Sequence, residues 1–317
     1  GHKPMQGDFP NIKKLVSHIF GEQYELGMDY LQLLYLKPVQ KLPILLLVSE
    51  ERNTGKTTFL NFLKALFQDN VTFNTNEDFR SQFNSDWAGK LLIVVDEVLL
   101  SRREDSERLK NLSTTLSYKV EAKGKDRNEI SFFAKFVLCS NNESLPVIID
   151  EGETRYWVRK ISSLQSDDTD FLRKLIAEIP AFLFHLQGRT LSAQQKSRMW
   201  FAPEQIATDA LRRIIRCNRN RLEVELSELF LEIMENTQTD SLQFCLNDAL
   251  SLLQCNHVKA EKHLVRKIVQ DCWKLQPSEN ALTYTSYEYN YNSSGHYSPT
   301  KRVGRFYTVT MDKLNSI

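Results

Sequence analysis

The sequence predicts an α/β protein whose core has three layers, with a parallel sheet between two layers of helices. Three apolar runs predict buried strands at residues 42–48, 91–95 and 132–139. Each run is continuous rather than alternating, which is typical of strands that are covered on both faces. Amphipathic segments at residues 57–67 and 106–116 lie between these runs and predict the helices that connect parallel strands.

The remaining regions read mainly as helices, with the clearest segments at residues 171–186 and 203–215. The C-terminal region has predicted helices at 221–235, 242–253 and 258–275 and predicted strands at 282–291 and 304–310. Three helices followed by a two-stranded ribbon is the order of a winged helix. We therefore expect a helical lead-in (1–40), a core (41–165), a helical lid or linker region (166–220) and a winged-helix-like domain (221–317).

Composition excludes several classes of protein. The 317 residues are 41% hydrophobic, which is enough for a large core, and the 41 basic residues balance 40 acidic ones. Contacts with nucleic acid must therefore come from local patches. The five cysteines form no CxxC pair, and the longest apolar run, residues 43–48, is far too short to cross a membrane. We expect a protein of the bacterial or host-cell cytoplasm, and a fragment of a longer chain.

The loop after the first predicted strand has the spacing of a phosphate-binding loop, except at its first position. In such a loop backbone N–H groups and a helix N-terminus bind phosphates, Lys56 reaches the β and γ phosphates, and Thr57 binds Mg²⁺. Glu50 stands where glycine is usual, which predicts either a strained backbone angle or a modified loop with the carboxylate turned away. The expected nucleotide-binding residues are Arg52, Asn53, Thr54, Gly55, Lys56, Thr57 and Thr58.

Two carboxylates follow the second predicted strand. Four branched apolar residues, 92–95, deliver Asp96 and Glu97 to the carboxyl end of that strand. We expect Asp96 to hold Mg²⁺ together with Thr57, and Glu97 to accept a proton from the attacking water. The alternative is a helix N-cap with a solvated neighbour.

Two further residues narrow the predicted chemistry. Asn141 ends the third strand in the segment Ser-Asn-Asn, where a neutral amide could orient the attacking water and touch the γ-phosphate. Arg155 precedes an aromatic segment and could offer its guanidinium to a γ-phosphate. The alternatives are an ordinary asparagine turn and a surface ion pair.

In this order, the loop, the acidic strand, the asparagine strand and the arginine resemble the superfamily 3 helicases, the compact AAA+ ATPases of viruses, phages and plasmids. The sequence looks closest to the primase-helicase proteins of phages and mobile elements. The resemblance implies an AAA+-like core that binds ATP and Mg²⁺. It assigns these roles: Walker A to Lys56 and Thr57, Walker B to Asp96 and Glu97, the sensor to Asn141 (or Asn142), and an arginine finger for the neighbouring subunit to Arg155.

The resemblance also implies a DNA-gripping hairpin between the second and third strands. Lys123 and Lys125 flank Gly124 there and would meet phosphates without reading bases. The alternative is a solvated charged turn. Residues 196–221 hold seven basic and two acidic residues, which could bind DNA or a neighbouring subunit, or form a solvated face.

We therefore expect an ATP-dependent DNA helicase that acts in the replication of a phage, plasmid or other mobile element. The resemblance implies a hexameric ring that translocates on single-stranded DNA, unwinds forked duplexes and works with a primase domain or partner. A second hypothesis is a nucleotide-switched DNA-binding initiator or regulator without unwinding activity. A third is a degenerate nucleotide site that is kept for assembly alone.

Overall fold

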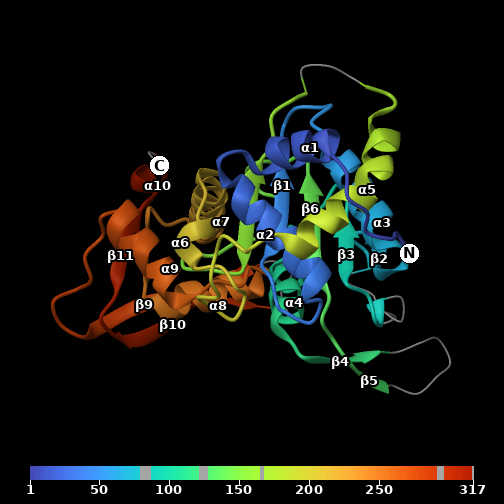
Figure 1. The fold of residues 1–317 in the computed structure, drawn as a ribbon. Coiled ribbons are helices and arrows are strands. Elements are labelled where there is room, and N and C mark those ends of the chain that lie inside the picture. The colour runs from blue at the N-terminus through green and yellow to red at the C-terminus, as the bar shows by residue number, and fades with distance from the viewer. Residues whose placement is uncertain (79–86, 121–127, 165–167, 291–295, 316–317) are drawn as a thin grey trace. The chain divides into compact units, whose positions relative to one another are not determined.

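A computed structural model describes residues 1–78, 87–120, 128–164, 168–290 and 296–315 (Figure 1). The chain forms two compact units, Gly1–Ile215 and Arg216–Ile317. All the described residues that the sequence predicts for a nucleotide site lie in the first unit. Within the described ranges, no helix is both long and apolar enough to cross a membrane.

The first unit is built on a parallel sheet of five strands. The three predicted strands form its centre, and their prediction is confirmed. An outer strand, β2, was not predicted because it has only four residues, is partly exposed and lies at the sheet edge. The strand order is β2 (Val71–Asn74), β3 (Leu92–Val95), β6 (Lys135–Ser140), β1 (Ile44–Val48) and β7 (Tyr156–Lys160).

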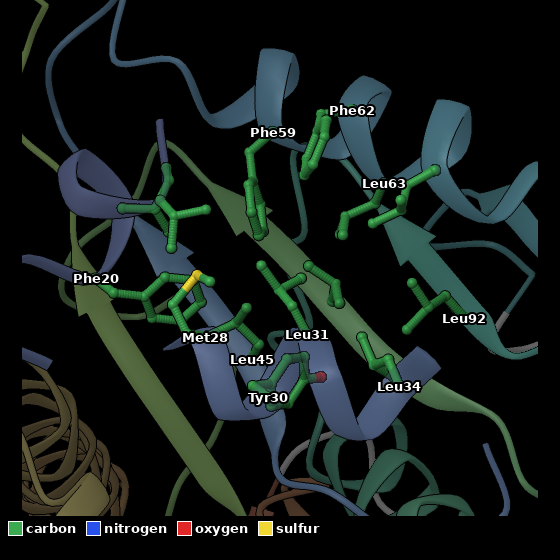
Figure 2. Packing of buried hydrophobic residues seen from close by; sticks show 14 of the residues in the cluster. Phe20, Met28, Tyr30, Leu31, Leu34, Leu45, Phe59, Phe62, Leu63 and Leu92 are labelled. Atoms are coloured by element: carbon green, nitrogen blue, oxygen red, sulfur yellow. The ribbon is translucent and has the colours of Figure 1, made fainter. Parts of the chain in front are cut away.

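Helices cover both faces of this sheet, which confirms the three-layer α/β core. One face packs against α1 (Pro10–Phe20), α2 (Tyr24–Leu36), α3 (Lys56–Phe67) and α5 (Phe171–Gly188). Figure 2 shows Phe59 and Leu63 of α3 pointing toward Leu31 of α2, with Leu45 of β1 and Leu92 of β3 among them. Burying each such side chain contributes about 2 kcal/mol. The other face packs against α4 (Arg103–Thr114) and the first residues of α7 (Asp209–Thr237).

The hairpin predicted between the second and third strands is present as an antiparallel ribbon. It consists of β4 (Ser117–Val120) and β5 (Asn128–Ser131), and it extends away from the sheet (Figure 1). The predicted DNA contacts Lys123 and Lys125 lie outside the described residues.

The helices that flank the sheet largely follow the prediction. Short 3₁₀ turns η1 (Gly21–Gln23) and η2 (Gln68–Asn70) follow α1 and α3. A single helix was expected from residue 203 to 215, and this is wrong: α6 (Pro203–Ile206) is separate, and α7 begins at Asp209. The Thr208 hydroxyl causes the break, because it accepts the N–H of Leu211 and donates to the Val158 carbonyl.

The second unit differs from the prediction in its strand pairing as well as in the limits of its helices. A ribbon of residues 282–291 and 304–310 was expected, but β9 (Leu282–Asn290) pairs with β10 (His296–Gly304), and β11 (Tyr307–Thr310) pairs with β8 (Ser241–Phe244). A helix was expected to begin at Leu242, but Leu242 lies in β8, which pairs with β11, and the Asp248 carboxylate caps α8 by accepting the N–H of Cys245. The next helix is shorter than expected, because α9 gives way to a π-helical turn, η4. The elements after α7 are β8 (Ser241–Phe244), α8 (Leu246–Cys255), α9 (Lys262–Lys267), η4 (Ile268–Cys272), β9 (Leu282–Asn290), β10 (His296–Gly304), β11 (Tyr307–Thr310) and α10 (Met311–Asn315).

The Tyr-rich strands of this unit pack against each other. Tyr289 lies opposite Tyr297 in the β9–β10 register, and the two ring centroids are 5.5 Å apart. Of the basic residues in this ribbon, Arg302 is paired with Asp248 at 2.8 Å and with Glu288 at 2.6 Å. The interpretation of this unit as a winged helix stays a prediction.

Candidate nucleotide-binding site

A polar cavity lies at the carboxyl ends of β1, β3 and β6. It has a volume of about 460 Å³ and is lined by residues 51–58, Asp96, Glu97 and Asn141. The Thr57 hydroxyl donates to the Asp96 carboxylate at 2.8 Å, although the two residues are far apart in the sequence. The fold therefore brings the predicted phosphate loop, the predicted acidic pair and the predicted sensor asparagine to one place.

Backbone geometry gives the loop its path into α3. Gly55 caps the helix with a φ of +78°, and Asn53 has a φ of +53°. These left-handed angles suit glycine and asparagine and are costly for most other residues. The Thr54 carbonyl accepts a hydrogen bond from Nε2 of His18 at 3.0 Å, which ties the loop to α1. The start of α3 thus points its free N–H groups into the cavity, as an anion site requires.

Lys56 is the first residue of α3 and is largely buried at the cavity wall. Burial lowers the pKa of Lys56, and the nearby carboxylates of Asp96 and Glu143 oppose this change. A cation that is held in a partly dry site interacts more strongly with a phosphate than a solvated one does.

The sequence allowed either a strained backbone at Glu50 or a loop with its carboxylate turned away, and Glu50 adopts the second arrangement. It is not among the residues with a positive φ, so its backbone is not strained in the left-handed region. Its carboxylate is turned toward Arg213, at 3.3 Å, and does not line the cavity. The loop therefore accommodates a side chain at its first position by pointing it away.

A buried carboxylate, Glu143, fixes this first turn of the loop. Glu143 is 2% exposed and accepts the backbone N–H of Glu50 at 3.1 Å. Its other oxygen pairs with Arg213 at 3.0 Å and with Lys160 at 2.9 Å. Burial alone would raise the pKa of Glu143, but the hydrogen bonds from Lys160 and the Glu50 N–H, with the charge of Arg213, outweigh burial and lower this pKa.

This network has no motif in the sequence. Glu143 directly follows the Ser-Asn-Asn segment, and Arg213 belongs to the basic run at 196–221. Nothing in their spacing indicates that they meet Glu50, because the network is made by tertiary packing. The one sequence feature that points to it is Glu50, because a side chain in place of the usual glycine must be accommodated outside the loop.

The acidic pair sits on a strained turn after β3. Glu97 is exposed and has a φ of +56°, a conformation that costs a non-glycine residue about 1–2 kcal/mol. Asn76 holds this turn, because its amide donates to the Glu97 carbonyl at 3.2 Å and accepts the Leu99 N–H at 2.9 Å. Strain of this kind often occurs where a side chain must be aimed at a site.

The two asparagines after β6 take different positions. Asn142 uses its side-chain oxygen to accept the N–H groups of Ser144 at 2.9 Å and Leu145 at 2.8 Å. That side chain is committed to a turn. Asn141 is exposed and lines the cavity, where its amide can meet a ligand.

Arg155 is not brought into the cavity. It directly precedes β7, whose first residue pairs with Ile44 at the start of β1. It therefore lies beyond the opposite end of the strands, about 13 Å or more from the loop after Val48. Its guanidinium pairs with Glu153 at 2.8 Å.

The donor set at the cavity suits a magnesium ion. Thr57 supplies a hydroxyl oxygen and Asp96 a half-buried carboxylate, and the two lie within hydrogen-bonding distance. Mg²⁺ prefers oxygen ligands and commonly takes one or two from the protein, with the rest from phosphate and water. Thr57 and Asp96 could therefore hold the ion that accompanies a nucleoside triphosphate.

Residues 47–159 match a family that is described only as a family of unknown function, DUF5906. The matched stretch contains the loop, Asp96, Glu97, Asn141 and Glu143. No curated protein matches the sequence.

Solved structures show a related fold. The apo structure of "NrS-1 C terminal region (305-718)" aligns with a TM-score of 0.61 at 16% identity, covering 96% of this chain and 77% of that chain. An A-form apo structure of the same region aligns with a TM-score of 0.60 at 15% identity, covering 98% and 77%. A JCV helicase structure with a bound small molecule reaches only 0.34 at 12% identity, covering 74% and 67%, which is too weak to support a conclusion. The chain thus shares the fold of the NrS-1 C-terminal region.

Proposed function

We propose that this protein is a Mg²⁺-dependent ATPase that works as a DNA helicase of the superfamily 3 type. The observation that carries the proposal is the hydrogen bond from Thr57 to Asp96. It joins a phosphate-type loop to an acidic strand end inside one cavity, which is the arrangement that nucleoside triphosphate hydrolysis needs.

Each residue of the cavity has a task in this proposal. Lys56 and the N–H groups of residues 52–58 bind the phosphates, and Thr57 with Asp96 holds Mg²⁺. When bound, the ion neutralises charge that develops on the phosphate oxygens. Glu97 takes a proton from the attacking water, and Asn141 orients that water against the γ-phosphate.

The proposal includes a ring, hexameric by its resemblance to the superfamily, that moves on single-stranded DNA. Because Arg155 lies at the far end of the strands from its own cavity, it acts in this scheme on the nucleotide of a neighbouring subunit. The β4–β5 ribbon contacts the strand, and Lys123 and Lys125, which lie between β4 and β5 in the sequence, are the proposed phosphate contacts. A shift of the ribbon on phosphate release would move the DNA.

The deciding experiment compares wild type with Lys56→Ala in ATP hydrolysis and in strand displacement on a forked substrate. We expect wild type to release a strand only with ATP and Mg²⁺, and the variant to lose hydrolysis by at least about 100-fold. Lys13→Ala, an exposed change on α1, is the control. Wild-type hydrolysis in Lys56→Ala would refute the nucleotide site, whereas hydrolysis without strand release would favour the nucleotide-switched DNA-binding protein.

The position of Arg155 has its own test. Arg155→Ala and Lys56→Ala chains are each expected to be inactive, but mixing them should restore part of the activity because some interfaces then keep both groups. ATP hydrolysis is measured across mixing ratios, with native mass spectrometry to verify mixed rings. Mixed rings without any recovered activity would remove Arg155 from the mechanism.

A further inference from the structure

A second concave surface lies at the amino-terminal ends of the central strands. This groove has a volume of about 740 Å³ and is lined by residues 36–41, which precede β1, by Thr114 and Leu116, and by Gln195 and Arg198. The nucleotide cavity lies at the carboxyl ends of the same strands, so the two sites lie at opposite ends of the central strands.

The groove carries positive charge without negative charge. Its lining includes Lys37, Lys41 and Arg198 and no aspartate or glutamate. Lys37 and Arg198 are exposed, and the Lys37 ammonium lies 4.6 Å from the centre of the Trp200 ring. Within the part of the chain that the structure describes, none of the three forms an ion pair with a carboxylate.

Two lysines are buried at this end of the sheet, Lys41 in the wall of the groove and Lys135 next to it. Lys41 is 9% exposed and donates to the Phe132 carbonyl at 2.8 Å, while Lys135 is 2% exposed and donates to the Pro38 carbonyl. Burial lowers the pKa of Lys41 to about 8 and that of Lys135 to about 7, the latter also through repulsion from Lys41. Buried ammonium groups without a counterion are costly, and an anion in the groove would offset that cost.

The groove adjoins the foot of the β4–β5 ribbon. Leu116 immediately precedes β4, Phe132 immediately follows β5, and the Phe132 N–H donates to the Leu116 carbonyl at 2.8 Å. The Lys41 ammonium donates a hydrogen bond to the carbonyl of the same residue, Phe132. A DNA strand that lies along the ribbon would therefore run into the groove at its base.

We propose that the groove binds single-stranded DNA, with the phosphates on Lys37, Lys41 and Arg198. The inference rests on the DNA partner of the proposed function. Val39 and Leu116, which are 73% and 78% exposed, then contact the faces of the bases. A single strand presents both phosphates and apolar base faces, whereas a duplex buries its bases in stacked pairs. The combination of unpaired cations with exposed apolar side chains therefore fits a single strand better than a duplex.

The test measures binding of a fluorescein-labelled oligothymidylate by anisotropy, with the full chain and no nucleotide. Lys37→Glu and Arg198→Glu are made singly and together, because both residues are exposed and the changes leave the core intact. We expect the double variant to weaken binding at least about tenfold and to reduce the slope of log affinity against log salt by about 1.4, the value for two single-strand phosphate contacts. Lys13→Glu with Arg173→Glu, exposed on α1 and α5, makes the same charge change elsewhere and should bind as wild type does.

The outcomes separate this inference from the proposed enzyme. Equal single-strand affinity in wild type, the double variant and the control, with ATP hydrolysis intact, overturns the groove and leaves the ATPase standing. Weakened binding of polyglutamate with unchanged DNA binding also overturns it, since the partner would then be an acidic protein. If the wild type hydrolyses no ATP but the double variant still binds DNA more weakly than the wild type, the groove is supported and the proposed enzyme is refuted.

Discussion

The two ends of the central sheet treat charge in opposite ways. At the carboxyl ends, Glu143 is buried but pairs with Arg213 and Lys160, and it accepts the N–H of Glu50. At the amino ends, the ammonium groups of Lys41 and Lys135 are buried, donate to backbone carbonyls and lie near the rings of Phe132 and Phe133, without an ion pair to a carboxylate among the described residues. A buried charge that is paired fixes the shape of a site, whereas one that is unpaired lowers stability until a ligand neutralises it. The charges at the carboxyl ends of the strands are therefore already balanced, whereas those at the amino ends would be balanced by a bound anion.

The largest expected effect comes from removing an unpaired charge. Lys135→Met replaces a buried ammonium with an apolar side chain of similar length, and we expect it to raise the free energy of unfolding by roughly 2 kcal/mol at pH 7. The measurement is thermal and chemical unfolding. Lys64→Met, a partly exposed lysine on α3, is the comparison and should give no such gain. Destabilisation by Lys135→Met would mean that Lys135 is satisfied where it lies.

The same lysine predicts a pH dependence of stability. Its pKa is about 7 in the folded chain and near 10.5 when solvated, so between these values the unfolded chain binds more protons. Wild-type stability should therefore rise with pH over this window, by at most about 1.4 kcal/mol per pH unit for this group, and Lys135→Met should flatten the rise. A similar rise in both proteins would contradict the assignment.

A smaller effect is expected from breaking the paired end. Glu143→Ala removes the buried carboxylate that pairs with Arg213 and Lys160, leaves Arg213 only its exposed partner Glu50, and frees the Glu50 N–H. We therefore expect KM for ATP to rise about tenfold with little change in kcat. Glu143→Gln keeps an acceptor for that N–H and should recover part of the loss. Glu204→Gln, exposed on α6, is the control. A fall in kcat with unchanged KM would contradict a role in placing the loop.

The smallest effect concerns Glu50 itself. Its carboxylate meets Arg213 at 3.3 Å, but both side chains are substantially exposed. Such pairs are worth less than about 1 kcal/mol. Glu50→Gly should therefore change KM for ATP by no more than about twofold. A larger loss would show that the side chain, and not only the backbone N–H, is needed at this position.

Much of the α/β core could be predicted from the sequence because its signals are local. The strands β1, β3 and β6 are continuous apolar runs, and the loop with Lys56 and Thr57 is a contiguous motif. β8 could not be found, because its four residues run directly into the helical periodicity of α8. The same limit hid Glu143 and Lys135, whose roles depend on partners that packing brings from distant segments.

The turn at Glu97 has a consequence for protein engineering. Asn76 follows the outer strand β2. Its side chain forms hydrogen bonds with the backbone on both sides of Val98 and so holds the turn that carries Glu97. An engineer who wished to retune the proposed hydrolysis without altering any acid or base could start from this amide. Replacing it with alanine would let the turn relax and leave the carboxylate intact but less well aimed.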